Sequence, residues 1–306
     1  MTDASDARLD DGRSMWQTSY RVRFDEAGPD GALRTSGFMR YAQDLAWQHS
    51  ADLGFGRSWY AERGLTWLVR AAELVVTAAP EMGSTISART AIVGIRRVFA
   101  RRRGEFTLAD GTPAGWVHTD WVLIDRRGAL TRIPAIFPET FGGAEVMDAV
   151  GRVSLPPTPP AATPRRFAVR PHELDPMDHA NNAVYLDWFE ESVLDAAGPI
   201  AGRDAATRVP RRYRMEFALA AEAGTQLDGA AWADGAGWSY RLAGADGGPD
   251  RYRATLRTGD AAGGQGDATV GGAAAATGQD QAADAGQKSM VDGADDGSDR
   301  EAVTGH

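Results

Sequence analysis

The sequence predicts an α+β protein made of two tandem copies of one unit, in which an antiparallel sheet wraps around a central helix. Three observations support this prediction. A proline-rich segment divides the chain, each half shows the same order of predicted elements, and matching segments of the two halves align without a gap inside each segment. The 306 residues, 43% of them apolar, suffice for one large domain or two ordinary ones.

The first half covers residues 15–150 and follows a loose N-terminus at residues 1–14. A short strand is predicted at Ser19–Phe24, and a helix is predicted from about Thr35 to Ala51. Apolar alternation with a high content of Val, Ile, Trp and Thr then predicts longer strands. These are expected at Leu65–Thr77, Ser84–Val98, Arg102–Leu108 and Ala114–Ile124.

A linker at residues 151–165 is predicted because its proline content leaves too few backbone donors for a central strand. The second half, residues 166–258, repeats the order of the first. A strand at Arg166–Arg170 precedes a helix from about Asn182 to Ala197. Later strands are expected at Val209–Ala221, Thr225–Ala233, Trp238–Leu242 and Arg251–Arg257.

The second helix is apolar over much of its circumference and therefore needs cover on several sides. A sheet wrapped around the helix would give that cover; an amphipathic helix lying on an open sheet is the alternative. Two shifts align the halves. A shift of 147 places Val22-Arg23 on Val169-Arg170, Glu26 on Glu173, Phe38 on Tyr185 and Tyr41 on Trp188, and a shift of 141 places Glu81–Ser84 on Glu222–Thr225.

The composition excludes several classes of protein. The chain has no cysteine, so disulfide scaffolds, thiol catalysis and thiolate zinc sites are excluded. A net charge of −9 argues against broad nucleic-acid binding. No apolar stretch of membrane-spanning length and no signal-peptide pattern is found, so no membrane insertion and a cytoplasmic location are expected. Residues 259–306 carry nine acids against Lys288 and Arg300, and this Gly-, Ala- and Asp-rich tail is predicted to be disordered.

The densest cluster of reactive polar groups lies at residues 173–182, between the short strand and the second helix. Asn181 or Asn182 is a natural N-cap, and the free amides of a helix start can stabilise a developing oxyanion. Asp175 and His179 lie four residues apart just before that start. A carboxylate and an imidazole there could activate water, or the carboxylate could attack a bound carbonyl directly.

A purely structural role for this cluster is a capped helix preceded by an Asp-Pro turn. The repeat argues against that alternative. Under the 147 shift Asp175 faces Gly28 and His179 faces Ala32, so the framework recurs while the reactive side chains occur in one copy only.

The segment from Val169 to Ser192, with Leu174-Asp-Pro-Met-Asp-His-Ala-Asn-Asn-Ala-Val-Tyr-Leu-Asp-Trp188, resembles the hotdog-fold thioesterases. With two tandem units and the motif in the second, the chain to about residue 257 resembles the acyl-ACP thioesterases. The resemblance implies a double hotdog, a first hotdog that shapes the acyl pocket and a second that carries the chemistry. It implies hydrolysis of fatty acyl-ACP to free fatty acid in fatty acid biosynthesis, with acyl carrier protein (ACP) as partner and no metal or cofactor.

The resemblance also assigns residue roles. Asp175 matches the family's essential aspartate and His179 its histidine, with Asn181 and Asn182 in the same motif; whether Asp175 is nucleophile or base stays open. Two departures occur, because the plant enzymes have Asn where this chain has Met177, and Asp178 precedes the histidine. The plant enzymes also place a Glu on the next long strand.

Ala220 stands at the position of that strand glutamate when Met215–Phe217 is aligned with the family's strand. Because side chains alternate along a strand, Glu222 would point to the same face and is the candidate substitute.

The expected substrate contacts lie on the second helix and on a basic run. Tyr185 and Trp188 are predicted to contact the acyl substrate, which would lie in an apolar tunnel between helix and sheet. Arg101, Arg102 and Arg103 are predicted to dock the acidic carrier; a solvated, charged strand pair is the alternative.

Three other functions remain as alternatives: an acyl-CoA thioesterase of the same fold, a non-catalytic acyl-binding protein, and a hotdog dehydratase, which this motif does not support. A homodimer is left open.

Overall fold

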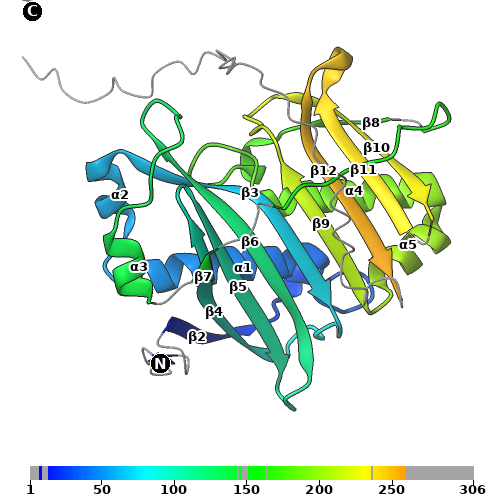
Figure 1. Cartoon of the computed structure of the whole chain (residues 1–306). Helices are drawn as coiled ribbons and strands as arrows, with labels where there is room; N and C mark the ends of the chain where they lie inside the picture. The colour runs from blue at the N-terminus through cyan, green and yellow to red at the C-terminus, as the bar shows by residue number, and fades with distance from the viewer. Residues whose placement is uncertain are drawn as a thin grey trace, which may run out of the picture. The chain divides into compact units, whose positions relative to one another are not determined.

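Twelve strands form one sheet in the part of the chain that the computed structural model describes. That part comprises residues 13–142, 151–162, 164–235 and 237–259, with the backbone of two short strands at 7–8 and 145–146. Figure 1 shows the sheet with the two long helices behind it. The described residues belong to a single compact unit.

The first half contains one long helix, two short ones and the strands on one side of the sheet. Its helical elements are η1 (Phe24–Glu26, a 3-10 helix), α1 (Thr35–Asp52), α2 (Arg57–Arg63) and α3 (Ile136–Phe141). Its strands are β1 (Ala7–Arg8), β2 (Ser14–Arg21), β3 (Leu65–Val76), β4 (Thr85–Arg96), β5 (Phe99–Leu108), β6 (Pro113–Asp125) and β7 (Glu145–Val146).

The second half repeats this order. Its helical elements are η2 (Pro171–Glu173), α4 (Asn182–Ala197), α5 (Pro199–Thr207) and η3 (Ala245–Gly247). Its strands are β8 (Arg165–Ala168), β9 (Arg211–Phe217), β10 (Gln226–Asp234), β11 (Gly237–Gly244) and β12 (Asp250–Thr258).

The strand order confirms that the chain contains one unit twice. The first half runs β2-β4-β5-β6-β3 across the sheet, and the second half runs β9-β12-β11-β10-β8, the same order reversed. The halves join where β3 pairs antiparallel with β9. Glu73 faces Arg214 near the centre of that pairing, and these residues are 141 positions apart, which is the second shift found in the sequence.

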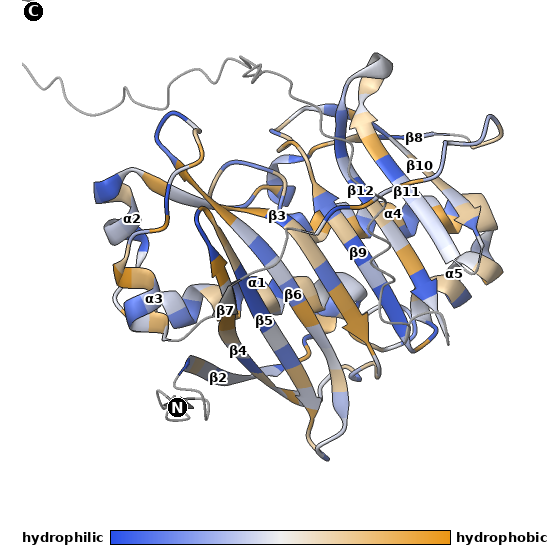
Figure 2. Cartoon of the chain, in the orientation of Figure 1, coloured by the Kyte–Doolittle hydropathy of each residue, from blue (hydrophilic) through white to orange (hydrophobic). Residues whose placement is uncertain are grey.

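Each long helix packs against the strands of its own half, as the broad apolar surface of the second helix predicted. Val184, Phe189 and Val193 of α4 are buried with Tyr213 of β9 and Tyr240 of β11 in one core that also includes α1. Figure 2 shows hydrophobic and hydrophilic residues alternating along the strands, so one sheet face covers the helices. Within the described residues no helix is long and apolar enough to cross a membrane.

The loops before α1 and α4 are hydrogen-bonded alike. Three backbone N–H to carbonyl bonds of the first loop recur in the second. They are Gly28 to Ala32, matched by Asp175 to His179; Arg34 to Glu26, matched by Asn181 to Glu173; and Leu33 to Pro80, matched by Ala180 to Ala221. Gly31 has φ +77°, and its equivalent Asp178 has φ +62°. Asp is one of the few residues that tolerate this left-handed conformation, so the repeat extends to backbone detail.

Three predicted strands had an end misplaced by three residues or more. The strand expected from Arg102 is β5, which already begins at Phe99, where it pairs with β4 and β6. The strand expected at Ser19–Phe24 is β2, which starts at Ser14 and ends at Arg21, because Glu26 accepts the backbone N–H of Arg23 and turns the chain into η1. The strand expected at Val209–Ala221 ends at Phe217, because Ala218 and Leu219 both donate to the carbonyl of Arg251. The short helices α2, α3 and α5 were not predicted.

The described part of the linker is anchored to two buried carboxylates. Gly151 N–H donates to Asp120 Oδ2 (2.8 Å) and Val153 N–H to Glu216 Oε2 (3.1 Å). Asp120 lies on β6 and Glu216 on β9, so the linker is held against strands of both halves. The predicted tail, apart from Gly259, and nearly all of the predicted loose N-terminus lie outside the described residues.

Candidate active site

The loop from Glu173 to Asn182, which we call the reactive loop, holds Asp175 by backbone hydrogen bonds. Asp175 Oδ1 accepts the N–H of Met177 at 2.8 Å and the N–H of His179 at 3.5 Å. The backbone N–H of Asp175 donates to the carbonyl of His179 at 2.8 Å, which closes the turn. Oδ2 accepts no hydrogen bond from the described residues, so one carboxylate oxygen is left for a substrate or a water molecule.

The start of α4 follows directly. The side chain of Asn181 caps the helix by accepting the N–H of Ala183 at 2.9 Å, which confirms the predicted cap. The N–H of Val184 donates to the carbonyl of Asn181, whereas the N–H of Asn182 has no acceptor among the described residues. This amide, at the positive end of the helix dipole, can donate to a carbonyl oxygen on which negative charge develops.

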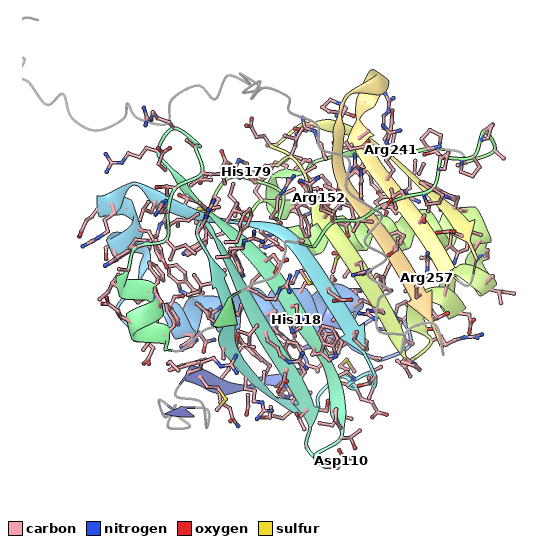
Figure 3. All side chains as sticks on the ribbon, viewed as in Figure 1. Asp110, His118, Arg152, His179, Arg241 and Arg257 are labelled. Carbon is pink, nitrogen blue, oxygen red and sulfur yellow. The ribbon has the colours of Figure 1, made fainter. Side chains whose placement is uncertain are left out.

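His179 is partly buried, and Figure 3 shows it at one end of the sheet, with Asp110 at the other end and His118 between them. Its imidazole makes no hydrogen bond to a described residue. The structure therefore brings His179 and Asp175 together through the backbone of one turn, while their side chains do not form a pair.

Tyr185 and Trp188 lie in the core beneath this loop. Trp188 is 2% exposed and packs on Phe167 and Tyr185, and Tyr185 also packs on Phe217 and Tyr252. Burial raises the pKa of Tyr185 to about 12, with a small further increase from the charge of Asp175. Both aromatic side chains thus support the start of α4, and direct contact with substrate stays a prediction.

Glu222 lies on an exposed turn after β9, and its N–H interacts with Thr225 Oγ1. The alternation that placed Ala220 and Glu222 on one strand face does not apply, since the strand has ended at Phe217. The prediction that Glu222 shares a strand face with Ala220 was therefore wrong. The turn does follow Ala221, whose carbonyl accepts the N–H of Ala180 from the reactive loop.

The three arginines of β5 alternate between the two faces of the sheet. Arg102 is 7% exposed, donates to His49 Nδ1 at 2.8 Å and stacks on Phe141, so the prediction that it docks a carrier was wrong. Burial and the charge of Arg102 lower the pKa of His49 to about 3. The neutral imidazole therefore accepts a hydrogen bond from Arg102, and its other nitrogen is hydrogen-bonded to the hydroxyl of Ser14.

Arg101 and Arg103 point to the opposite face. Arg101 makes a bidentate ion pair with Asp120, one of the carboxylates that hold the linker. Arg103 donates to Glu105 at 2.6 Å and to His118 at 3.0 Å, and it stacks on Trp116. Arg101 thus has a structural role, and a docking role for either residue stays a prediction.

A cluster that the sequence analysis missed lies at the start of α1, the equivalent of the reactive site. Tyr213 Oη donates to Glu190 Oε1 at 2.6 Å, and Arg211 donates to Thr35 Oγ1 at 3.2 Å. Thr35 also lies close to the carboxyl group of Glu190. We call these four residues the filled cluster. The only signal in the sequence was the 147 shift, which places Thr35 on Asn182.

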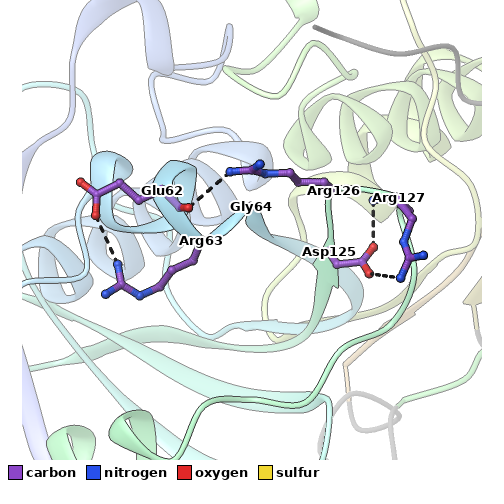
Figure 4. Close-up of a pocket in the computed structure, with 6 residues that line it drawn as sticks. All are labelled: Glu62, Arg63, Gly64, Asp125, Arg126 and Arg127. Carbon is purple, nitrogen blue, oxygen red and sulfur yellow. Dashed lines mark hydrogen bonds and ion pairs between the residues drawn. The ribbon is translucent and has the colours of Figure 1, made fainter.

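Two hollows of the described residues lie elsewhere, on the first half. One, of about 330 Å³, is formed by the ends of α2 and β6, where Figure 4 shows Glu62 paired with Arg63 and Asp125 paired with Arg127. The other, of about 170 Å³, is lined by Arg13, Arg89, Arg103 and Glu105 among others. Neither contains a residue of the reactive loop, so the predicted acyl tunnel is not one of these hollows.

Family comparisons agree with the geometry. Models of the acyl-ACP thioesterase N-terminal and C-terminal domains match residues 13–140 and 159–199. The chain belongs to the acyl-ACP thioesterase family. A chloroplastic acyl-[acyl-carrier-protein] hydrolase of Cuphea viscosissima is 26% identical over 195 residues, or 58% of this chain. The matched segment spans 47% of that relative, about half its length.

Solved structures of acyl-ACP thioesterases share the fold. The enzyme from Bacteroides thetaiotaomicron superposes with a TM-score of 0.67 at 16% identity, covering 79% of this chain and 97% of that one. The 12:0-ACP thioesterase from Umbellularia californica superposes with a TM-score of 0.65 at 19% identity, covering 79% and 96%. The double hotdog predicted from the sequence is therefore confirmed.

Proposed function

We propose that this member of the acyl-ACP thioesterase family hydrolyses fatty acyl-ACP in fatty acid biosynthesis. The observation that supports this most is that Asp175 keeps one carboxylate oxygen without a hydrogen bond to the described residues, in the loop that leads to the unbonded N–H of Asn182, whereas the other loop of the same backbone has no such side chain. A residue needed for the turn alone would be expected in both loops, but Gly28 stands at the equivalent of Asp175.

The reaction consumes one water molecule and divides the thioester. Water oxygen becomes bonded to the acyl carbon, the carbon–sulfur bond breaks, and the sulfur leaves as the carrier thiol. Asp175 either takes a proton from the attacking water or attacks the carbonyl first, after which water cleaves the resulting anhydride. In both routes the carbonyl oxygen lies against the N–H of Asn182, where its developing charge is stabilised. His179 is close enough along the loop to orient the thioester.

Hydrolysis of acyl-ACP and acyl-CoA by the purified wild-type chain, measured side by side as release of free thiol, tests this proposal. We expect acyl-ACP to be hydrolysed with the higher kcat/KM. Preference for acyl-CoA would favour a coenzyme A thioesterase, and tight binding of acyl-ACP without hydrolysis would favour the acyl-binding alternative. The cytoplasmic location and a homodimer stay predictions that belong with this function.

We also propose that the acidic carrier docks at the outward arginines beside the smaller hollow. Arg89 and Arg103 share Glu105 as partner there, which leaves an excess of positive charge. We expect the double substitution Arg89→Ser, Arg103→Ser to raise KM for acyl-ACP about three- to tenfold and to weaken its salt dependence, because rim charges act mainly on encounter. The kcat should stay within about twofold.

A matched pair of substitutions at the other hollow is the control. Arg63→Ser with Arg126→Ser removes the same charge from a different surface and should leave KM for acyl-ACP unchanged. Equal KM values for the wild type and the Arg89, Arg103 variant would contradict docking at this surface and leave hydrolysis itself unaffected.

A further inference from the structure

The helices α1 and α4 are related by a local two-fold axis that exchanges residue n with residue n + 147. Arg40 of α1 pairs with Asp187 of α4 at 3.1 Å, and these two residues are 147 positions apart. A contact between symmetry-related positions places the axis next to that pair. The β3–β9 pairing obeys the same symmetry with the 141 shift that applies to the strands. Ala72 pairs with Met215, and their equivalents in the other half, Tyr213 and Leu74, pair with each other.

This symmetry relates the filled cluster to the start of α4. Thr35, the first residue of α1, lies close to the side chain of Glu190 on α4. Exchanging the halves converts Thr35 to Asn182 and Glu190 to Gln43. The symmetry thus relates Gln43 of α1 to the first residue of α4, whose backbone N–H has no acceptor among the described residues.

The equivalent place is not filled in the same way. Under the 141 shift, Tyr213 corresponds to Ala72, whose side chain is too short to reach Gln43. Arg211 corresponds to Arg70, which lies at a bulge in β3 and donates to the carbonyls of Phe217 and Ala218 instead. The tyrosine hydroxyl and the inward guanidinium of the filled cluster thus have no counterparts beside Asn182.

Gln43 consequently has an unsatisfied polar atom. Its Oε1 is inaccessible to solvent and has no hydrogen-bond partner among the described residues, whereas the equivalent Glu190 accepts from Tyr213. A buried acceptor without a donor is costly to the folded state, and native proteins retain one mainly where a ligand or water supplies the missing bond.

We propose that Gln43, from the first half of the chain, completes the active site by holding the attacking water through its side-chain oxygen. This inference rests on the proposed function. The thioester group has no hydrogen to donate, while water has two. Gln43 accepts one of them, and the other goes to the Asp175 carboxylate, either while it acts as the base or as it is released when the C–O bond of the anhydride breaks. Gln43 is then a positioning residue that orients the water oxygen toward the carbonyl held at Asn182.

Substitution of Gln43 by Leu separates this role from a structural one. We expect Gln43→Leu to lower kcat for acyl-ACP by about 10²-fold, with KM within about threefold of wild type, because the lost bond is made to the nucleophile. The melting temperature should stay the same or rise, since an unsatisfied buried polar atom has been removed. Gln43→Glu keeps an acceptor oxygen and should recover part of the activity.

Glu190→Gln is the matched control, because Glu190 occupies the same helix position in the filled cluster. It should lower the melting temperature and leave kcat within about twofold. An active wild type with an equally active Gln43→Leu variant would overturn the inference alone, as would a Gln43→Glu variant no more active than Gln43→Leu. A wild type that hydrolyses no acyl thioester would overturn the proposed function and this inference with it.

Discussion

We expect Asp175→Asn to lower kcat for acyl-ACP hydrolysis by about 10²- to 10⁴-fold or more, because an amide can act neither as base nor as nucleophile. The fold should be unaffected. Asn has the same shape, and its Oδ1 can still accept the N–H groups of Met177 and His179 that hold the turn. Initial rates and a thermal melt of the same preparation measure both expectations.

Asp178→Asn in the same loop is the control for this prediction. Asp178 is exposed and has φ +62°, a conformation that Asn also tolerates, so turnover and melting temperature should both stay close to wild type. Turnover of Asp175→Asn near the wild-type rate would show that the chemistry occurs elsewhere.

The largest effect on stability is expected for Phe189→Ala, at about 3–5 kcal/mol of unfolding free energy. Phe189 is fully buried in α4, stacks on Tyr240 of β11 and meets Tyr213 of β9 edge-on. Truncation would leave a cavity between the helix and the sheet that surrounds it. Equilibrium denaturation by urea measures the loss.

Phe24→Ala provides the comparison, since Phe24 is 85% exposed in η1 and its truncation should change stability by no more than about 0.5 kcal/mol. A loss of less than about 1 kcal/mol for Phe189→Ala would mean that α4 is not enclosed by its sheet as described.

The repeated architecture could be predicted because helix and strand periodicity are local properties of the sequence. Helix α4 runs from Asn182 to Ala197 as predicted, since Asn181 caps it and Gly198 follows its last residue. The ends of β2 and β9 could not be predicted. Those strands stop where Glu26 and the carbonyl of Arg251 capture backbone N–H groups, and these contacts depend on how the loops pack.

In the candidate site, too, local features could be predicted from the sequence, whereas features that depend on packing could not. Asp175, His179 and the cap at Asn181 lie in one loop, so their proximity follows from sequence spacing. The burial of Arg102 could not be foreseen, because a basic run does not reveal which residue of a strand faces the helix.

Gln43 was missed for a further reason. It lies on α1, far from the motif in sequence, and only the pairing of Arg40 with Asp187 places it opposite Asn182. The 147 shift contained that relation, but the contact between the two helices was needed to use it.

We infer that only one of the two equivalent loops, the one before α4, carries the chemistry. A crystal structure of the chain with a non-hydrolysable acyl-pantetheine ketone, in which a methylene group replaces the thioester sulfur, tests it most directly. We expect one bound molecule per chain, with the ketone oxygen at hydrogen-bond distance from the N–H of Asn182 and the Asp175 carboxylate facing the same carbon. A ketone bound instead at the start of α1, beside Gly28 and Thr35, would contradict it.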